Sequence, residues 1–242
     1  MAGFRRGRYV ARFADTPEDL TAAQRLRHLC FRGGEGLDAD PFDELCLHVL
    51  VEEADGGDLV CCFRLLPFRD GTEIGASYAA QFYGLESLRD YSGRMVEMGR
   101  FCIRPGLRDP DVLRVAWGAM TEYVDSEGVE LLFGCSSFQG TEADKHMDAF
   151  ALLADRHLAP KRWLPRVKAP RVFRFASRLG LGAPNLKLAQ KAMPPLLRTY
   201  LVMGGWVSDH AVVDNDLGTM HVFTGLEIAA IPSARKRLLR AT

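Results

Sequence analysis

The sequence lacks the long apolar runs that mark membrane-spanning helices. None of its 242 residues belongs to an uncharged apolar run of about 18 residues or more, the length needed to cross a bilayer. The basic stretch 1–17 is not followed by the apolar run of a secretory signal. We therefore expect a cytoplasmic protein.

Closely paired cysteines are absent as well. No CxxC pair occurs, and the chain has no secretory signal, so its thiols are expected to be reduced and buried. The same spacing argues against zinc, and we expect no bound metal. The six cysteines all lie among apolar neighbours: Cys30, Cys46, Cys61, Cys62, Cys102 and Cys135.

Acidic residues are missing from one long segment, between Arg156 and Ser208. The net charge of the whole chain is zero, so the remainder is correspondingly acidic. A long run of one sign attracts a polyanion. The alternative is a solvated surface whose acidic partners come from elsewhere in the fold. The segment's cations are Arg156, Lys161, Arg162, Arg166, Lys168, Arg171, Arg174, Arg178, Lys187, Lys191 and Arg198.

What the sequence does contain is the composition of a globular protein with a substantial core, with 48% hydrophobic and 26% charged residues. No internal repeat or low-complexity tract interrupts it. The order of elements predicts an α/β (α+β) fold around one mostly antiparallel sheet. The predicted helices cover 17–32, 110–125 and 142–156, and the predicted strands cover 48–54, 58–68, 72–83, 96–105, 130–138, 199–208 and 220–231.

The first predicted helix carries a charge on its apolar side. Thr16 and Pro17 mark its start. At 100° per residue, Arg27 falls on the same face as apolar residues. A buried arginine needs acidic partners, and the nearest acids downstream are Asp40 and Asp43. The alternative is that Arg27 extends along the surface to reach water.

The predicted strand 96–105 holds two further charges, Glu97 and Arg100. Three residues apart, they project to opposite faces of a regular strand, although a bulge would change this. A carboxylate partly buried in a sheet is a candidate general base, because burial raises its pKa. The alternative is a structural ion pair.

A turn with anion-binding character follows that strand. Pro105, Gly106 and Pro110 bracket it, and Arg104 and Arg108 add positive charge. The N–H groups and the dipole of the next helix favour an anion there, so the turn is a candidate phosphate site. It matches no P-loop or GxGxxG pattern, and an ordinary strand–turn–helix connection is the alternative.

Six charged residues thus lie in apolar contexts within the first hundred residues, three acids and three bases. They predict a polar site inside the fold. Such a site could bind a zwitterionic small molecule, or its members could bind one another. The six are Arg27, Asp40, Asp43, Arg64, Glu97 and Arg100.

The motifs "RHLCF", "DADPFDE", "CFRLLP" and "EMGRF" occur in this order within roughly the first 110 residues. This part of the chain resembles the acyl-homoserine-lactone synthases, which have the GNAT acyltransferase fold and take acyl groups from acyl carrier protein. Those enzymes carry a tryptophan shortly after the phenylalanine that matches Phe31. Here "RGGEGLDAD" lacks any aromatic residue, which argues against S-adenosylmethionine as the amine substrate.

Over residues 8–240 the chain is similar to a sister family, the ornithine–acyl carrier protein N-acyltransferases of ornithine-lipid synthesis. The stretches that carry this similarity are "YAAQFYGL", "EMGRFCIRP", "LFGCSSFQGT", "PPLLRTYLVMGGWVSDHAVVD" and "LGTMHVFTGLEI". The resemblance implies one GNAT-like domain over 1–242, with a basic segment at about 156–208 inserted between core strands.

The same resemblance implies a reaction and assigns roles. The α-amine of L-ornithine attacks the thioester of a 3-hydroxyacyl carrier protein, giving lyso-ornithine lipid. Glu97 is the expected base, with Arg100 beside it as the second catalytic residue. Asp40 and Asp43 would bind the ammonium groups, and Arg64 or Arg100 the carboxylate. The expected substrate-binding residues are Arg27, Phe31, Asp40, Asp43 and Arg64.

The donor side is expected to use the phosphopantetheine arm of the carrier protein and no bound cofactor. Strand N–H groups near Phe101 and Cys102 would polarise the thioester carbonyl, and Arg104, Gly106 and Arg108 would hold the phosphate. The acidic carrier protein would dock on the basic segment, and no nucleic acid is expected. The same surface could rest on anionic lipid at the inner face of the membrane, helped by the C-terminal "ARKRLLR". The predicted docking residues are Lys161, Arg162, Arg166, Lys168 and Arg171.

Three alternatives stay open at this point. The chain could make an acyl-homoserine lactone, or it could be an N-acyltransferase that uses acyl-CoA. It could also be a non-catalytic module that binds carrier protein or a lipid surface. In the site itself, four of the charged residues could merely scaffold the N-terminal lobe: Arg27, Asp40, Asp43 and Arg64.

Overall fold

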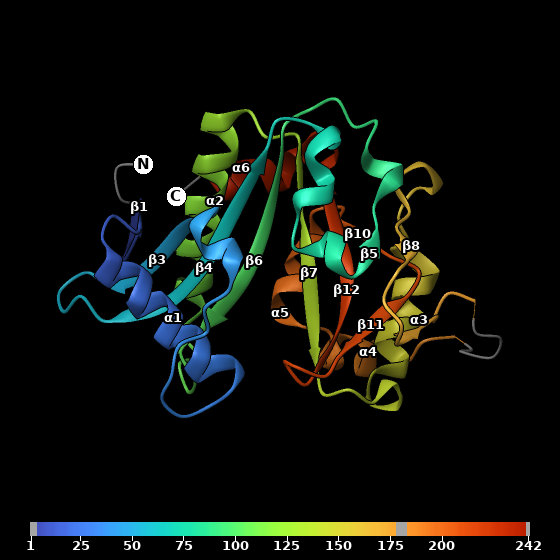
Figure 1. Cartoon of the computed structure of the whole chain (residues 1–242), viewed down its shortest axis with the longest axis horizontal. Coiled ribbons are helices and arrows are strands. Elements are labelled where there is room, and N and C mark those ends of the chain that lie inside the picture. Colours follow the sequence, from blue (N-terminus) through green and yellow to red (C-terminus); the bar gives the residue numbers. More distant parts are fainter. Residues whose placement is uncertain (1–3, 178–182, 241–242) are drawn as a thin grey trace. The chain divides into compact units, whose positions relative to one another are not determined.

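The computed structural model describes residues 4–177 and 183–240, with side chains described up to residue 237 (Figure 1). Its internal contacts divide the chain into two compact units. Unit 1 comprises Met1–Pro67, Val96–Val129 and Ser233–Thr242, and unit 2 comprises Phe68–Met95 and Glu130–Pro232. The expected single domain, with residues 156–208 inserted between core strands, stays a prediction.

Unit 1 is built on a sheet whose strands follow the order β1, β2, β3, β4, β6. The first four pair antiparallel with their neighbours. The predicted strands 48–54, 58–68 and 96–105 are confirmed as β3, β4 and β6, while β1 and β2 were not predicted. The strands are β1 (Phe4–Arg6), β2 (Tyr9–Phe13), β3 (Leu47–Glu53), β4 (Leu59–Phe68) and β6 (Met95–Ile103), and the helices are α1 (Pro17–Phe31), η1 (Pro41–Glu44), α2 (Pro110–Glu127) and α6 (Ser233–Arg240).

Two long helices cover opposite faces of this sheet. Leu50 and Cys62 face each other across β3 and β4 and pack under α1 with Ala23 and its neighbours. Phe13 of β2 pairs with Val49, the residue next to Leu50, so its side chain points to the opposite face of the sheet. There it meets Tyr123 of α2 edge-on, with 6.1 Å between the ring centroids. In Figure 1, α1 accordingly lies in front of the strands and α2 behind them.

The predicted helix ends of unit 1 are confirmed. The Thr16 hydroxyl accepts a hydrogen bond from the Asp19 N–H at 3.2 Å, and Pro17 opens α1. Asp109 caps α2 by accepting from the Asp111 N–H at 2.9 Å. Gly128 ends α2 in a left-handed conformation, φ 63°, which glycine adopts without steric cost.

Unit 2 has a second antiparallel arrangement, in the order β7, β12, β11, β9, with β10 also paired to β12 and β5 paired to β8. Its core packs Phe138 against Phe150 of α3, with Phe175 stacked on Phe150. The strands are β5 (Tyr83–Gly84), β7 (Leu131–Gln139), β8 (Arg166–Val167), β9 (Val172–Phe173), β10 (Trp206–Val207), β11 (Ala211–Asp214) and β12 (Thr219–Glu227). The helices are η2 (Gly71–Ala76), η3 (Ala79–Gln81), η4 (Glu86–Leu88), η5 (Ala143–His146), α3 (Met147–Arg156), η6 (Lys161–Trp163), α4 (Leu186–Ala192), α5 (Pro195–Val202) and η7 (Ile228–Ala230).

One strand prediction in unit 2 is wrong, and a second is confirmed only in part. Residues 72–83 form the short helices η2 and η3, because the Asp70 carboxylate accepts the Thr72 N–H and starts a helical turn. Within 199–208, residues 206–207 form the short strand β10, as predicted, but residues 199–202 are the end of α5, which Pro195 begins at its first turn. The predicted helix 142–156 starts with η5 and becomes α-helical at Met147. The α+β class with a mostly antiparallel sheet is confirmed.

Among the described residues, no helix is both long and apolar enough to cross a membrane. All six cysteines are free thiols, as expected. Three of them are buried and three are half-buried, so the expectation that all six are buried holds in part. The buried ones are Cys61, Cys62 and Cys102, and the half-buried ones are Cys30, Cys46 and Cys135.

Candidate active site

Unit 1 contains a closed ring of alternating charges beside α1. Each arginine in it bridges two aspartates, and each aspartate accepts from two arginines. The three positive and three negative charges balance. We call this cluster the charge ring; in order around it the members are Arg27, Asp38, Arg100, Asp40, Arg64 and Asp43.

Arg27 of α1 forms the deepest corner of the charge ring. Its Nε donates to the Asp38 carboxylate at 3.0 Å, and its two terminal nitrogens donate to the Asp43 carboxylate at 2.7 and 3.0 Å. It also donates to the Asp38 carbonyl oxygen. The side chain is 1% exposed. Arg27 is therefore held by acids, as one prediction had it, and does not extend to the surface.

The other two arginines come from neighbouring strands. Arg64 of β4 donates to Asp40 at 2.6 and 2.9 Å and to Asp43 at 2.7 Å. Arg100 of β6 donates to Asp38 at 2.9 Å and to Asp40 at 3.0 Å. These ion pairs connect α1, β4 and β6 to the segment that follows α1.

The three aspartates are placed by the short helix η1 and the loop before it. Asp40 caps η1, accepting from the Phe42 N–H at 2.9 Å, and Pro41 fixes the first helical residue. The Asp43 carboxylate in turn accepts the Asp40 N–H, completing a reciprocal cap. The spacing of three between these two acids is thus the spacing of one helical turn.

The sequence prediction of Arg27's partners needs correction. Asp43 is one partner, but the second is Asp38, and Asp40 binds the two strand arginines instead. Asp38 was missed although it stands two residues before Asp40 in the same acidic run. Its position after the loop 33–37, which follows α1, brings it back onto the helix, a fold-level result that spacing alone does not reveal.

Two further polar groups support Asp43 and were not predicted. The Gln24 side-chain amide donates to its carboxylate at 3.0 Å. The His48 Nε2 lies 3.0 Å from its carbonyl oxygen. Burial lowers the pKa of His48, so this histidine is neutral near pH 7. Gln24 is a polar residue of α1, and its residue type alone does not indicate a buried partner.

The ionisation of the ring aspartates follows from this packing. Burial alone would raise the pKa of Asp43, but hydrogen bonds from Arg27 and Gln24 outweigh it and hold that pKa well below its usual range. The pKa of Asp40 is lowered in the same way, burial being outweighed by Arg64 and Arg100. Both carboxylates are therefore ionised at physiological pH.

These pKa shifts predict an acid-sensitive fold. A carboxylate with a lowered folded-state pKa contributes stability above its unfolded pKa of about 4 and loses it as pH falls further. We expect the free energy of unfolding to be flat from pH 7 to 5 with respect to these groups and to drop steeply below pH 4. Denaturant unfolding between pH 7 and 3 measures this free energy. If it falls with pH as steeply in the Asp43→Asn variant as in the wild-type protein, the lowered pKa of Asp43 is contradicted.

Exposure differs around the charge ring. Arg27, Asp38, Asp43 and Arg64 have side chains that are between 1% and 4% exposed. Arg100 is 10% exposed, and Asp40 is 18% exposed. The corner formed by Asp40 and Arg100 is therefore the part of the charge ring that a solute can approach.

Glu97 lies on β6, three residues before Arg100, and is 3% exposed. Its charge acts on the Cys46 thiol together with those of Arg64, Asp43 and Asp40, which places Glu97 within electrostatic range of the same group as the ring. Burial and these acids raise the pKa of Cys46 to about 11. Glu97 is thus a buried acid on the strand that supplies Arg100 to the charge ring.

The backbone of β6 is irregular at Arg100, which has φ 53°. A residue in this left-handed region breaks the regular alternation of side chains along a strand. Arg100 and Cys102 nevertheless both belong to the α1 side, since Cys102 packs with Cys62 in the cluster beneath α1. The irregularity that the sequence reading named as an alternative is present at this residue.

Of the next two residues of the candidate site, Cys102 is buried and Phe101 is half-buried. Phe101 stacks on Phe63 with ring centroids 5.6 Å apart, and the Cys102 sulfur lies 3.5 Å from that of Cys62. The hydrogen bond with Cys30 lowers the pKa of Cys102, but the hydrogen bond with Cys62 and burial outweigh it and hold that pKa well above its usual value. Phe31 packs against the same cluster.

The turn after β6 closes between Arg104 and Leu107, whose N–H donates to the Arg104 carbonyl at 3.2 Å. Pro105 and Gly106, φ 84°, fill the central positions, as in a type II turn. The Arg104 guanidinium leaves the turn and donates to the Leu59 carbonyl, and Arg108 is exposed.

The start of α2 already holds an anion. The Asp109 carboxylate caps the helix and also accepts from Arg8 and the Tyr9 hydroxyl, each at 3.1 Å. Arg104 instead faces an open groove of about 650 Å³ beside α1. The groove is lined by Pro17, Glu18, Thr21, Ala22, Arg25, Leu26, Leu29, Leu59 and Arg104.

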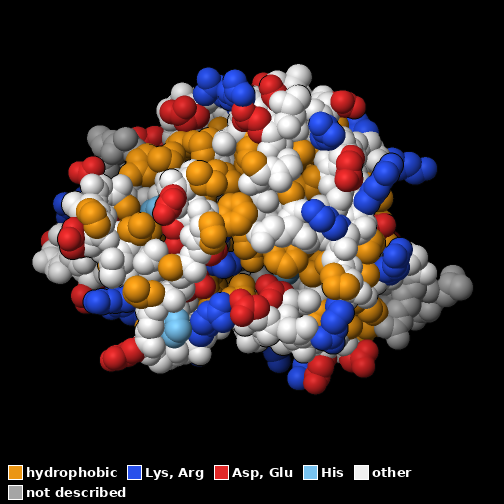
Figure 2. Space-filling model, in the orientation of Figure 1, with side chains coloured by type: hydrophobic (Ala, Val, Ile, Leu, Met, Phe, Trp, Pro, Cys, Tyr) orange, Lys and Arg blue, Asp and Glu red, His pale blue; other side chains and the backbone are white. Residues whose placement is uncertain are grey.

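The predicted docking residues of unit 2 are all exposed, and Figure 2 shows Lys and Arg side chains on the right-hand part of the view. Some have partners from elsewhere in the unit. Arg162 lies 3.5 Å from the Glu227 carboxylate, Lys168 donates to the Ala80 carbonyl at 2.6 Å, and Arg171 donates to Asn215 at 3.0 Å. Lys161 and Arg166 complete the set. Arg178 of the basic segment falls outside the described residues.

Comparison with known proteins identifies the class of this chain. Residues 27–118, which hold the charge ring and the strand with Glu97, match the acetyltransferase (GNAT) domain. The chain is an N-acyltransferase with the GNAT fold.

The full-length relatives define the family. The L-ornithine N(alpha)-acyltransferase of Rhodobacter capsulatus is 33% identical, covering 92% of this chain and 91% of that protein. The enzyme of the same name from Brucella abortus is 29% identical, covering 94% and 87%. This chain belongs to the L-ornithine N(alpha)-acyltransferase family. Among solved structures, a CoA-dependent acyl-homoserine lactone synthase, BjaI, matches 93% of this chain and 82% of that one, at 14% identity and a TM-score of 0.48.

Proposed function

We propose that this protein transfers a 3-hydroxyacyl group from acyl carrier protein to the α-amine of L-ornithine, the first step of ornithine-lipid synthesis. The observation that carries the proposal is the 33% identity to an L-ornithine N(alpha)-acyltransferase over nine-tenths of both chains. Its acceptor is taken from the name of that relative, and its donor from the family resemblance described above.

The reaction forms one amide bond and breaks one thioester. The α-ammonium of ornithine loses a proton, its nitrogen attacks the thioester carbon, and the carrier's phosphopantetheine leaves as a thiol after taking up a proton. The products are an N-acyl ornithine and the free thiol of the carrier arm. The protein must therefore hold the amino acid, accept a proton and stabilise the charge that develops on the carbonyl oxygen.

The acceptor is proposed to bind at the exposed corner of the charge ring. Asp40 offers a carboxylate for an ammonium group, and Arg100 offers a guanidinium for the carboxylate. The remaining members are more buried than these two and would scaffold this corner. Arg27, Asp43 and Arg64 thus take the structural role that the sequence reading kept as an alternative, and Phe31 packs beneath them.

Glu97 is the proposed general base. It is a buried acid on the strand that carries Arg100, and its charge reaches the same thiol as the charge ring. An acid in such a place can take a proton from the incoming ammonium directly or through one water.

The donor arm is proposed to lie along the end of β6. N–H groups near Phe101 and Cys102 would face the thioester, while the two side chains pack against Phe63 and Cys62. Because Asp109 already occupies the start of α2, the phosphate would be held by Arg108 and the exposed turn at Gly106, with Arg104 at the neighbouring groove.

The exposed basic residues of unit 2 are the proposed carrier-protein surface, since carrier proteins are acidic and this segment lacks acids. We expect the double variant Arg166→Glu/Arg171→Glu to raise KM for the acyl carrier donor about tenfold or more, because like charges then oppose docking. The KM for a small N-acetylcysteamine thioester should not change. The double variant Arg69→Glu/Arg89→Glu, an equal charge change at two other exposed sites, is the matched control. A rise in KM for both donors would refute carrier docking at this surface.

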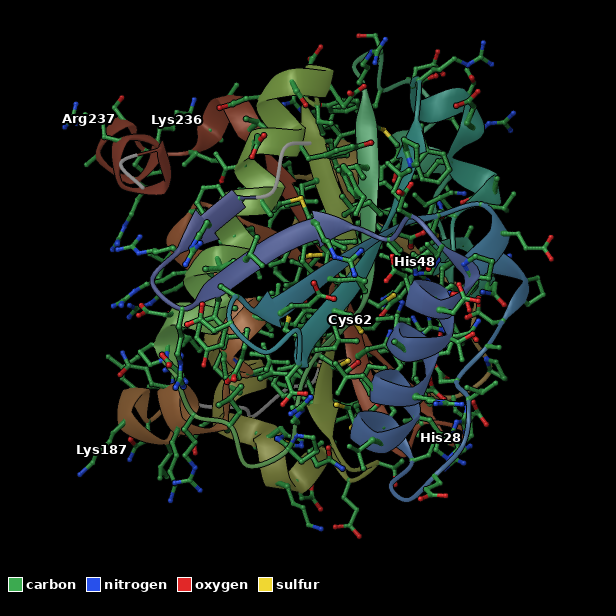
Figure 3. All side chains as sticks on the ribbon, turned by 90° about the vertical axis from the view of Figure 1, so that its left-hand side faces the viewer. His28, His48, Cys62, Lys187, Lys236 and Arg237 are labelled. Atoms are coloured by element: carbon green, nitrogen blue, oxygen red, sulfur yellow. The ribbon has the colours of Figure 1, made fainter. Side chains whose placement is uncertain are left out.

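We also propose that the protein contacts anionic lipid. The leucines of α4, Leu186 and Leu188, are 45% and 51% exposed beside Lys187 (Figure 3). Exposed leucines next to lysines are suited to the interface of an anionic membrane. Lys236 and Arg237 of α6, also labelled in Figure 3, add positive charge to unit 1. Co-sedimentation with phosphatidylglycerol vesicles, absent with phosphatidylcholine vesicles, is the expected result.

The proposed function is tested with the purified protein and mass spectrometry. One arm contains 3-hydroxyacyl carrier protein and L-ornithine; parallel arms replace the carrier by acyl-CoA, or ornithine by S-adenosylmethionine. N-acyl ornithine formed only with the carrier donor supports the proposal. Product from acyl-CoA alone would assign a different donor, and a lactone would assign the synthase reaction.

A further inference from the structure

Arg100 has an unusual backbone conformation. Within residues 4–177 and 183–240 it is the one non-glycine residue with a positive φ, 53°. It sits inside β6, and the glycine next to it, Gly99, keeps its φ outside that region. The chain therefore places an arginine in the conformation that glycine adopts most readily, although a glycine is one residue away.

This conformation is costly for any side chain with a Cβ atom, because the Cβ approaches the following carbonyl oxygen. Residues held this way persist only when surrounding structure over-determines them, and they gather at functional sites. Something in the fold must therefore hold Arg100 there.

The charge ring supplies that restraint. The two arms of the Arg100 guanidinium donate to Asp38 and Asp40 at 2.9 and 3.0 Å. Neither carboxylate is free to follow a movement of Arg100. Asp38 is bound on its other side by Arg27 and Asp40 by Arg64. The side chain is clamped at two fixed points, and the backbone to which it is attached is clamped with it.

We infer that Arg100 acts in acyl transfer chiefly through its backbone: Asp38 and Asp40 hold it left-handed and so fix the direction of the peptide groups at residues 100 and 101. Asp38, which touches no substrate, is then a positioning residue. This inference rests on the proposed function, which puts the thioester beside Phe101.

Four substitutions separate the backbone role from a direct role of the guanidinium. Glycine and asparagine enter the left-handed region readily, whereas alanine does not. Lysine keeps the charge but cannot span two carboxylates as the guanidinium fork does. All four lose the same paired contacts, so they can be compared with one another. The variants are Arg100→Gly, Arg100→Asn, Arg100→Ala and Arg100→Lys.

The readouts are kcat and KM for ornithine in N-acyl ornithine formation. We expect kcat to follow left-handed preference, with Arg100→Gly about 5- to 30-fold above Arg100→Ala and also above Arg100→Lys. KM for ornithine should rise equally in the glycine and alanine variants, because both lack the guanidinium that is proposed to bind the carboxylate. A direct role of the charge predicts the reverse order, with Arg100→Lys the most active. Equal kcat for the glycine and alanine variants would also overturn the inference.

The positioning role of Asp38 is tested by combining Asp38→Asn with Arg100→Gly. Asp38→Asn should lower kcat in the wild-type background and leave it unchanged in the Arg100→Gly background, where no side chain needs holding. An equal loss in both backgrounds would assign Asp38 a different role.

A measurement without substrate keeps this inference separate from the proposed function. If the wild-type protein acylates no ornithine, the proposed function fails, and thermal unfolding still tests the strain. Arg100→Gly is expected to melt about 2–8 °C above Arg100→Ala. An alanine variant as stable as the glycine variant would show that residue 100 carries no strain for the ring to hold.

Discussion

Replacing Asp43 with alanine is expected to destabilise unit 1 by about 3–5 kcal/mol, the usual effect of removing one partner from a buried ion pair. Asp43 accepts from both Arg27 and Arg64, whose side chains are 1% and 3% exposed. Without it, two guanidinium groups stay buried with an incomplete set of acceptors. Urea unfolding followed by circular dichroism measures the loss.

The matched control is Glu73→Ala, which removes an acid whose partner, Arg69, is 86% exposed. Exposed pairs contribute little, so its unfolding curve should nearly overlay that of the wild-type protein. Asp43→Asn should resemble Asp43→Ala more than the wild type, because the amide cannot offer two charged acceptors. A midpoint for Asp43→Ala as close to wild type as the control's would contradict the charge ring as a structural unit.

The second large effect is expected in catalysis. Glu97→Gln should lower kcat by about 10²- to 10⁴-fold, the range that a positioned general base contributes. KM for ornithine should change little, because the amide keeps the shape of the side chain. Steady-state kinetics with saturating carrier donor measure both values, and a thermal melt confirms that the variant is folded.

Glu44→Gln is the control for this variant, since Glu44 lies in η1 beside the ring acids but is exposed. It should keep wild-type kcat. If Glu97→Gln retains a tenth or more of wild-type kcat, Glu97 is a structural partner, as the sequence reading allowed, and the base must be sought elsewhere.

The charged site was predictable because charge in an apolar context is a strong local signal. Arg27 falls on the inner face of a well-capped helix, and Arg64 lies in a strand of otherwise apolar residues. Both are buried and both bind acids. Burial of an unpaired charge is so costly that the existence of partners follows from the pattern alone.

The identity of the partners and the form of β6 were not predictable in the same way. Asp38 reaches Arg27 only because the loop after α1 turns back onto that helix. The left-handed Arg100 depends on two carboxylates brought from a distant segment. The strand predicted for 72–83 was wrong for a local reason, because the Asp70 side chain caps a helical turn two residues further on.

The most direct test of this account is the structure of the product, read by tandem mass spectrometry after incubation of the purified protein with 3-hydroxyacyl carrier protein and L-ornithine. The account predicts a single amide on the α-nitrogen, with the side-chain amine free. Acylation of the side-chain amine, or no N-acyl ornithine while the carrier thioester stays intact, would contradict it.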